Sequence, residues 1–176
     1  GVKCMVDKAK AKGINMGVHT LSNFITTNDS YVTPVPSRHL QKQGVLTLTD
    51  DITESQTDIR IQKSDLFEIP LSLNTLQIDD ELIIYNKVKK ETDFFLLKDC
   101  KRGAFKTKAS GHSSKTPLYK LSDHAYKVFF PDLALQDTLA DRIADLMNKT
   151  GLSQISFDGL EGCSYTGHDE YATSRF

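Results

Sequence analysis

The stretch that decides the fold is LSQISFDGLEG, at residues 152–162. Apolar and polar side chains alternate over residues 154–157, which predicts a short strand that ends at Asp158. Two glycines follow and allow the chain to turn sharply. Asp158 and Glu161 therefore lie just beyond the carboxyl end of a strand, which is where parallel α/β folds place their chemistry.

The same layout of helix, glycine and short apolar strand occurs twice. Residues 2–12 and residues 133–149 each carry an apolar stripe at helical spacing, and a glycine that can end the helix follows each of them. The strand after the first helix, residues 14–19, ends at His19. Two such units imply parallel neighbouring strands, so we expect His19 and Asp158 at one edge of the same sheet.

Between these units the helical periodicity disappears and turn signals separate short β-rich runs. The predicted strands are residues 45–48, 58–62, 81–85, 94–97 and 117–121. Strands at this spacing favour a small barrel or sandwich. We predict three parts, which are an αβ unit with a polar loop at residues 1–44, an inserted all-β module at residues 45–122, and a second αβ unit at residues 123–176.

Composition excludes several classes of function. The net charge of −1 gives nucleic acid or an anionic membrane surface no electrostatic attraction, and no apolar run approaches the roughly 20 residues of a membrane span. Cys4, Cys100 and Cys163 have no metal-binding spacing and are expected as three separate reduced thiols. No dinucleotide or P-loop motif is present, and we expect no cofactor and no metal.

Two parts of the chain resemble known patterns. DDELIIY at residues 79–85, CKRGAFKT at residues 100–107 and His112 are similar to a recurrent β-module pattern, from which Lys106 departs because the pattern has glycine there. The flanking segments GVHT at residues 17–20, FITTND at residues 24–29 and FDGLEG at residues 157–162 resemble the core of bacterial carbohydrate-active (β/α)8 enzymes, namely alpha-galactosidase-like glycoside hydrolases and barrel-type polysaccharide lyases.

This resemblance implies a fold and a setting. The fold class expected is α/β, a partial (β/α)8-type barrel segment with an inserted small all-β domain. The two parallel strands would be the third and fourth strands of the barrel. The parent protein would be secreted or periplasmic, and the chain a fragment of it whose exposed sheet edges favour self-association.

The expected catalytic residues are Asp158, Glu161 and His19. Glycoside hydrolysis needs two carboxyl groups that flank the sugar, with Asp158 as nucleophile or charge stabiliser and Glu161 as acid or substrate-orienting group. His19 could donate a hydrogen bond to a sugar or act as the base of a lyase. The structural alternative is that Asp158 only forms a turn, Glu161 is a solvated charge and His19 binds a backbone carbonyl.

Further polar side chains are candidates for substrate binding. They are Asn23, Asp29, Tyr31 and His168. His168 lies near other acids, but no HExxH-type spacing supports a metal site. A basic group in the β-module could bind an acidic glycan or form a solvated turn, and it comprises Arg102, Lys106, Lys108 and His112.

The leading interpretation is a fragment of a polysaccharide-degrading enzyme that hydrolyses glycosidic bonds, with a poly- or oligosaccharide as its partner. The first alternative is a uronate polysaccharide lyase with His19 or Tyr31 as base. The second is a non-catalytic carbohydrate-binding or structural module, in which the β-module is the functional part.

Overall fold

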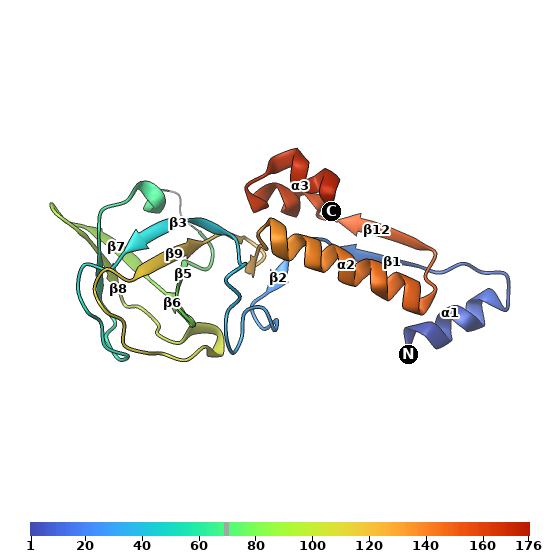
Figure 1. Ribbon diagram of the computed structural model, residues 1–176, viewed down its shortest axis with the longest axis horizontal. Helices are drawn as coiled ribbons and strands as arrows, with labels where there is room; N and C mark the ends of the chain where they lie inside the picture. Colours follow the sequence, from blue (N-terminus) through green and yellow to red (C-terminus); the bar gives the residue numbers. More distant parts are fainter. Residues whose placement is uncertain (69–70) are drawn as a thin grey trace. The chain divides into compact units, whose positions relative to one another are not determined.

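The computed structural model describes residues 1–68 and 71–176 and divides the chain into two compact units. The first, called the αβ unit here, consists of Gly1–Phe24 and Pro131–Phe176. The second, called the β unit, is Ile25–Phe130. Figure 1 shows the helices in the first and the short strands in the second. The chain leaves the αβ unit after its first strand and returns at its long helix.

The αβ unit holds two parallel strands. Its elements are α1 (Val2–Lys10), β1 (Gly17–Leu21), α2 (Leu133–Thr150), β12 (Gln154–Asp158), the 3₁₀ helix η3 (Leu160–Thr166) and α3 (Asp169–Arg175). Residues of α2 and β12 line a shared apolar pocket of about 180 Å³, so the long helix packs on one face of the strand pair (Figure 1). Asp132 caps α2 by accepting a hydrogen bond from the Leu135 N–H at 2.9 Å. Gly151 ends the helix in the left-handed conformation, with φ of 73°.

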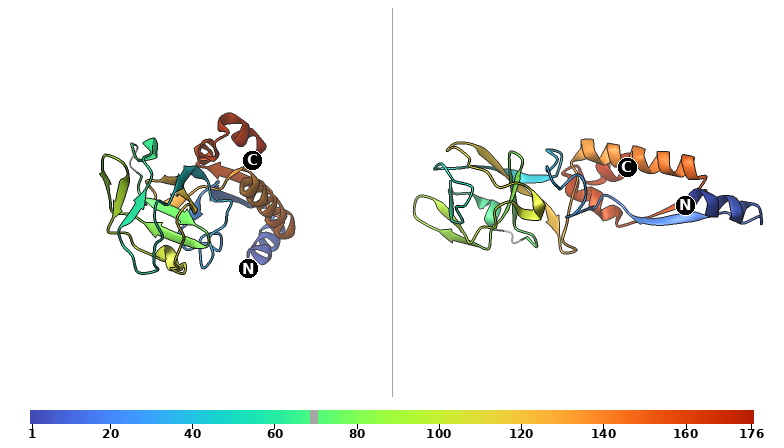
Figure 2. Two further views of the ribbon diagram at one scale, coloured as in Figure 1. Left: turned by 60° about the vertical axis from the view of Figure 1, so that its left-hand side comes forward. Right: turned by 90° about the horizontal axis from the view of Figure 1, so that it is seen from below.

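The β unit is built from short antiparallel strands, which Figure 2 shows from two further sides. Their bounds are β2 (Ile25–Thr26), β3 (Lys42–Thr47), β4 (Ile59–Ile61), β5 (Thr75–Ile78), β6 (Glu81–Ile84), β7 (Lys87–Lys90), β8 (Phe95–Lys98), β9 (Pro117–Leu121), β10 (Asp123–His124) and β11 (Val128–Phe129), with 3₁₀ helices η1 (Asp65–Phe67) and η2 (Ala104–Lys106). The largest sheet has the order β3-β9-β5-β6, and smaller sheets have the orders β4-β8-β7 and β10-β11-β2.

One hydrophobic core joins the two larger sheets of the β unit. Aliphatic side chains from both sheets are fully buried in it, including Leu46, Ile59, Leu76, Ile83 and Leu97. Along β4 and β8 buried residues alternate with more exposed ones, as the period of two requires, whereas all four residues of β5 are buried. Burial of these side chains supplies the main driving force for folding of the unit.

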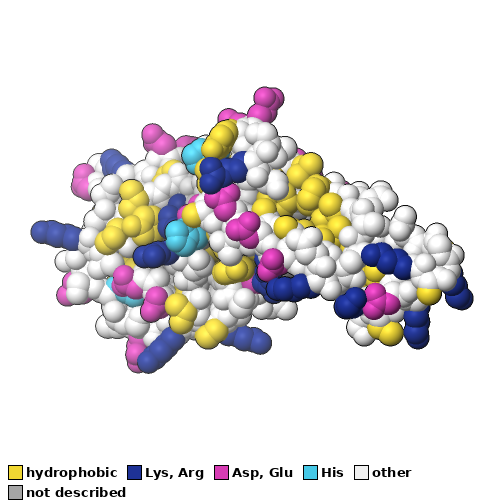
Figure 3. Space-filling model, turned by 45° about the vertical axis from the view of Figure 1, so that its right-hand side comes forward, with side chains coloured by type: hydrophobic (Ala, Val, Ile, Leu, Met, Phe, Trp, Pro, Cys, Tyr) yellow, Lys and Arg dark blue, Asp and Glu magenta, His cyan; other side chains and the backbone are white. Residues whose placement is uncertain are grey.

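The αβ unit buries its apolar surface less completely. Large apolar side chains remain exposed in the helices and strands of this unit and in the loop before β1. They are Val2, Met5, Ile14, Val18, Leu21, Leu146, Phe157, Tyr165 and Tyr171. Figure 3 shows apolar side chains gathered on the face that it draws. Self-association through this unit stays a prediction.

The prediction of a (β/α)8-barrel segment is wrong, and with it the resemblance to barrel enzymes. Strands β1 and β12 form a sheet of two strands, and the other sheets of the described residues are antiparallel. The repeated pattern of helix, glycine and strand dictates the direction of neighbouring strands but not how many strands a sheet contains. A small all-β body is present, although it does not make the chain an α/β barrel with an insert.

Several local predictions are confirmed. Helices occupy residues 2–10 and 133–150, and β12 ends at Asp158 as expected. The first strand begins three residues later than predicted, at Gly17, and runs past His19 to Leu21. Strands β2, β5, β7, β10 and β11 were not predicted. No helix of the described residues has the length and apolar character needed to cross a bilayer.

Candidate functional site

The parallel pairing of β1 and β12 builds the candidate site. In its register His19 lies opposite Ser156 and Leu21 lies opposite Asp158. Because side chains alternate between the faces of a sheet, Ser156 and Asp158 project from the same face of β12. The sequence prediction that His19 and Asp158 come from neighbouring parallel strands is therefore confirmed.

The imidazole of His19 lies between a carboxylate and a hydroxyl. Its Nε2 is 3.4 Å from Oδ2 of Asp158, and its Nδ1 is 3.1 Å from Oγ of Ser156. With the proton on Nε2, directed at the carboxylate, Nδ1 keeps a lone pair that accepts a hydrogen bond from the Ser156 hydroxyl. The basic nitrogen of the ring is then Nδ1.

These groups are accessible to a ligand. The side chain of His19 is 66% exposed and that of Asp158 is 57% exposed. An exposed polar contact of this kind contributes little to stability. The site can hold and transfer a proton on an open face of the sheet.

Ser156 is the residue of this group that sequence reasoning missed. Its signal was its position two residues before Asp158, on the same face of the strand. The order of hydroxyl, imidazole and carboxylate is also that of a nucleophilic serine site. However, the N–H groups of β1 and β12 lie in the plane of their sheet, and none of them points at an oxyanion above Ser156. The geometry therefore favours Ser156 as a proton relay rather than a nucleophile.

Glu161 and His168 lie beyond the end of β12 and do not join this group. Glu161 is exposed in the first turn of η3, and within the described residues it makes no hydrogen bond or ion pair. His168 is the residue before α3, and its ring contacts that of Tyr171 with centroids 6.4 Å apart. A role in substrate binding or catalysis stays a prediction for both residues.

Asn23 has a structural position. It is 3% exposed, adopts a positive φ of 62°, and donates a hydrogen bond from Nδ2 to Oε1 of Gln136 at 2.9 Å. The side-chain oxygen of Asn23 has no partner among the described residues. Burial keeps this residue away from a substrate on the open face of the sheet.

Asp29 and Tyr31 belong to the β unit. Asp29 accepts a hydrogen bond from the backbone N–H of Tyr31 at 2.9 Å, and its carboxylate thereby closes a turn. This contact explains why an aspartate suits the position. The hydrogen bond does not test the predicted role of Asp29 and Tyr31 in substrate binding, which stays a prediction.

Two members of the basic group predicted in the β unit, Arg102 and His112, have buried side chains, whereas Lys106 and Lys108 are exposed. Glu81 is fully buried, and Arg102 donates to its carboxylate from Nε and Nη2, both at 2.8 Å. The His112 Nε2 atom is 2.9 Å from the same carboxylate, and its Nδ1 atom is 3.0 Å from Oδ2 of Asp79. Burial alone would raise the pKa of Glu81, but the hydrogen bonds from Arg102 and His112 outweigh it and hold that pKa below its usual value.

This network explains why the β unit carries an acid at position 81, an arginine at position 102 and a histidine at position 112. The remaining N–H groups of Arg102 bind the backbone carbonyls of Thr53, Gln56 and Ser110. The guanidinium has no donor left for an acidic glycan. Glycan binding by the exposed Lys106 and Lys108 stays a prediction. The side chains of Arg102 and His112 instead tie together strands and loops that are far apart in the sequence.

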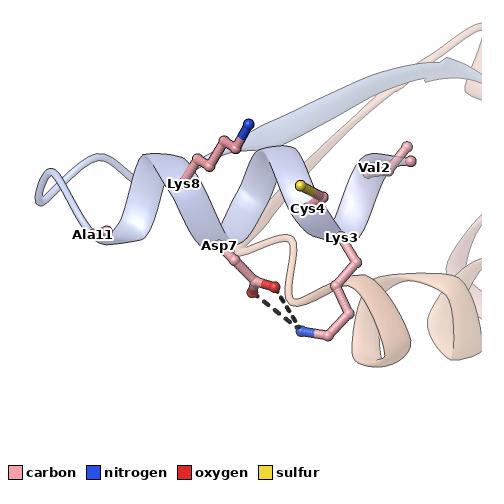
Figure 4. A pocket seen from close by; sticks show the side chains of 7 residues that line it. Val2, Lys3, Cys4, Asp7, Lys8 and Ala11 are labelled. Atoms are coloured by element: carbon pink, nitrogen blue, oxygen red, sulfur yellow. Dashed lines mark hydrogen bonds and ion pairs between the residues drawn. The ribbon is translucent and has the colours of Figure 1, made fainter.

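A further hollow lies at the surface of the αβ unit. Its volume is about 710 Å³ and it runs along α1, but that helix and its ends supply its whole lining (Figure 4). Lys3 and Asp7 form an exposed pair in this lining, with Nζ 3.1 Å from the carboxylate, and Lys8 adds a second cation. Over residues 1–68 and 71–176, no three His, Cys, Asp or Glu side chains gather as a metal site would require.

Comparison with protein families, with curated proteins and with solved structures gives no match for this chain. The geometry within each unit is therefore the only basis for assigning a function to the chain.

Proposed function

We propose that the chain is part of an enzyme that cleaves a uronate-containing poly- or oligosaccharide by elimination, with His19 as the proton acceptor. The observation that carries this proposal is the distance of 3.4 Å between His19 Nε2 and Asp158 Oδ2. A carboxylate in this position orients an imidazole and stabilises the imidazolium that forms when the ring accepts a proton.

The chemistry uses both ring nitrogens. The proton on the carbon next to the uronate carboxylate passes to Nδ1 of His19, directly or through the hydroxyl of Ser156. The electron pair of that C–H bond forms a carbon–carbon double bond, and the glycosidic C–O bond breaks. The leaving oxygen takes a proton from water, which reaches the exposed face freely.

The open position of the site suits a polymer. Small molecules are usually held in enclosed clefts that bury most of their surface. A polysaccharide chain can instead lie along an exposed sheet face and present one bond to His19. The polar side chains of β12 on this face, Gln154 and Ser156, can form hydrogen bonds with sugar hydroxyls.

Hydrolysis is the second candidate, favoured by a different observation. Asp158 and Glu161 both follow the end of β12, and two carboxyl groups are what glycoside hydrolysis uses. The contact between Asp158 and the imidazole makes elimination the first choice, because it equips His19 rather than Asp158 for proton transfer.

The test uses polygalacturonate and alginate as acidic polymers and dextran as the neutral polymer. Elimination predicts a product that absorbs in the near ultraviolet from an acidic polymer only. We expect His19→Gln to lower the rate by about 10²–10⁴-fold, and Arg142→Gln, at an exposed position of α2, to leave it unchanged. New reducing ends without absorbance would establish hydrolysis instead, and turnover of none of the polymers would refute an enzymatic role.

A further inference from the structure

The chain carries the tripeptide Asn-X-Ser/Thr twice, and this tripeptide is the acceptor for N-linked glycans. The first copy is NDS at residues 28–30, and the second is NKT at residues 148–150. The middle residue is not proline in either copy, so both have the required composition. The folded structure gives the two copies different surroundings, and these surroundings decide which copy can react.

The first copy lies in a surface turn of the β unit, directly after β2. The Asp29 N–H donates to the Thr26 carbonyl at 3.0 Å, so Asn28 lies at the tip of a tight turn. Asn28 and Ser30 are both exposed. The connection from residue 27 to residue 41 leads on to β3, and exposed connections of this kind tolerate added groups.

The side chains of this copy leave the reacting groups available. Oδ1 of Asn28 accepts a hydrogen bond from Thr26 Oγ1 at 2.8 Å. The amide nitrogen, Nδ2, then faces away from Thr26, and it makes no hydrogen bond within residues 1–68 and 71–176. The Ser30 hydroxyl donates one long hydrogen bond, of 3.3 Å, to Oδ1 of Asp29. The amide and the hydroxyl that glycan transfer requires are therefore both accessible.

The second copy lies in the last turn of α2, where its hydroxyl is not available. Thr150 is 8% exposed, and its Oγ1 donates to the Leu146 carbonyl at 2.7 Å. The Gly151 N–H donates to the Met147 carbonyl and closes the helix over this copy. Asn148 itself is exposed. A transferase could reach the Thr150 hydroxyl only by unwinding the end of α2.

We infer that Asn28 is an acceptor for an N-linked glycan in the folded chain and that Asn148 is not. The donor is an oligosaccharide joined to a lipid through pyrophosphate. Nδ2 of Asn28 forms a bond to C1 of the first sugar and loses a proton. The bond between C1 and the pyrophosphate oxygen breaks, and the lipid pyrophosphate leaves with that electron pair. The site uses residues of the β unit alone and does not depend on the proposed elimination at His19.

The test treats the folded chain with an oligosaccharyltransferase and a lipid-linked oligosaccharide, and locates each glycan by intact mass and peptide mapping. Synthetic peptides of residues 24–34 and 144–154 present the two copies without the fold. We expect both peptides to be modified. In the folded chain, transfer to Asn28 should be at least about tenfold faster than transfer to Asn148, because the second site must first break a buried hydrogen bond.

Three outcomes would overturn the inference. Equal rates at the two positions of the folded chain would show that the fold does not select between them. A folded chain that stays unmodified while the peptide of residues 24–34 reacts would show that the turn hides Asn28. A peptide of either copy that is not accepted would show that the sequence, and not the structure, decides the choice.

Variants identify the group that the transfer requires. Ser30→Ala should abolish transfer to Asn28, and Ser30→Thr, which keeps a hydroxyl, should retain it. This pair separates loss of the hydroxyl from loss of the fold. Asn148→Gln is the matched control, because it removes the other copy and should leave the rate of transfer to Asn28 unchanged. Transfer to Asn28 in Ser30→Ala would contradict the assigned site.

Discussion

Replacing Glu81 with glutamine should destabilise the β unit more than any surface substitution. Arg102 Nε and the Gly103 N–H donate to one carboxylate oxygen, and Arg102 Nη2, the Ser110 N–H and His112 surround the other. In either orientation the new amide NH₂ therefore faces groups that themselves donate. The substitution also leaves the buried guanidinium without its counter-charge, since the Arg102 side chain is only 6% exposed.

The expected loss is about 3–5 kcal/mol in the free energy of unfolding of the β unit, the usual cost of removing one partner from a buried ion pair. The assay is urea unfolding followed by NMR peak intensities of amides in β4 and β8, which report on this unit. Glu68→Gln is the matched control, because Glu68 pairs with Lys90 on the surface and should cost less than about 1 kcal/mol. A loss below about 1 kcal/mol for Glu81→Gln would refute the account of the network.

Three further predictions follow from contacts in the two units. The pKa of Glu81 is lower in the folded protein than in the unfolded chain. Its contribution to stability is therefore present above about pH 4.3 and is lost as the pH falls through the pKa of the folded state. Urea unfolding between pH 7 and pH 2 should show this loss in the wild type and not in Glu81→Gln. Gly151→Ala should cost about 1 kcal/mol, because alanine is strained at φ of 73°; thermal unfolding should show a lower midpoint, and an unchanged midpoint would contradict the assigned helix end. A thiol reagent should modify exposed Cys4 quickly and Cys100 only after unfolding, because burial is the main cause that raises the pKa of Cys100 to about 12; equal rates in the folded protein would contradict this.

The sequence allowed the central geometry to be predicted. Periodicity and terminating glycines located α1 and α2, and the repeated helix–strand order implied that the strands ending near His19 and Asp158 run parallel. These signals are local, so they can be recognised without knowledge of the rest of the fold. The number of strands in the sheet has no local signal, which is why the barrel prediction failed.

The chemistry of the β unit was harder to predict because it depends on burial. Arg102 and His112 are polar residues in a turn-rich segment, which usually indicates exposure. The structure buries both against Glu81, which lies 21 and 31 positions earlier in the sequence.

The most direct test of the account is a double-mutant cycle on the rate at which an acidic polymer gives the absorbing product. The four proteins are wild type, His19→Gln, Asp158→Asn and the double variant. If Asp158 acts only through the imidazole 3.4 Å away, the double variant should be as slow as His19→Gln alone. Two losses that multiply would mean that the residues act independently, and would contradict the proposed pair.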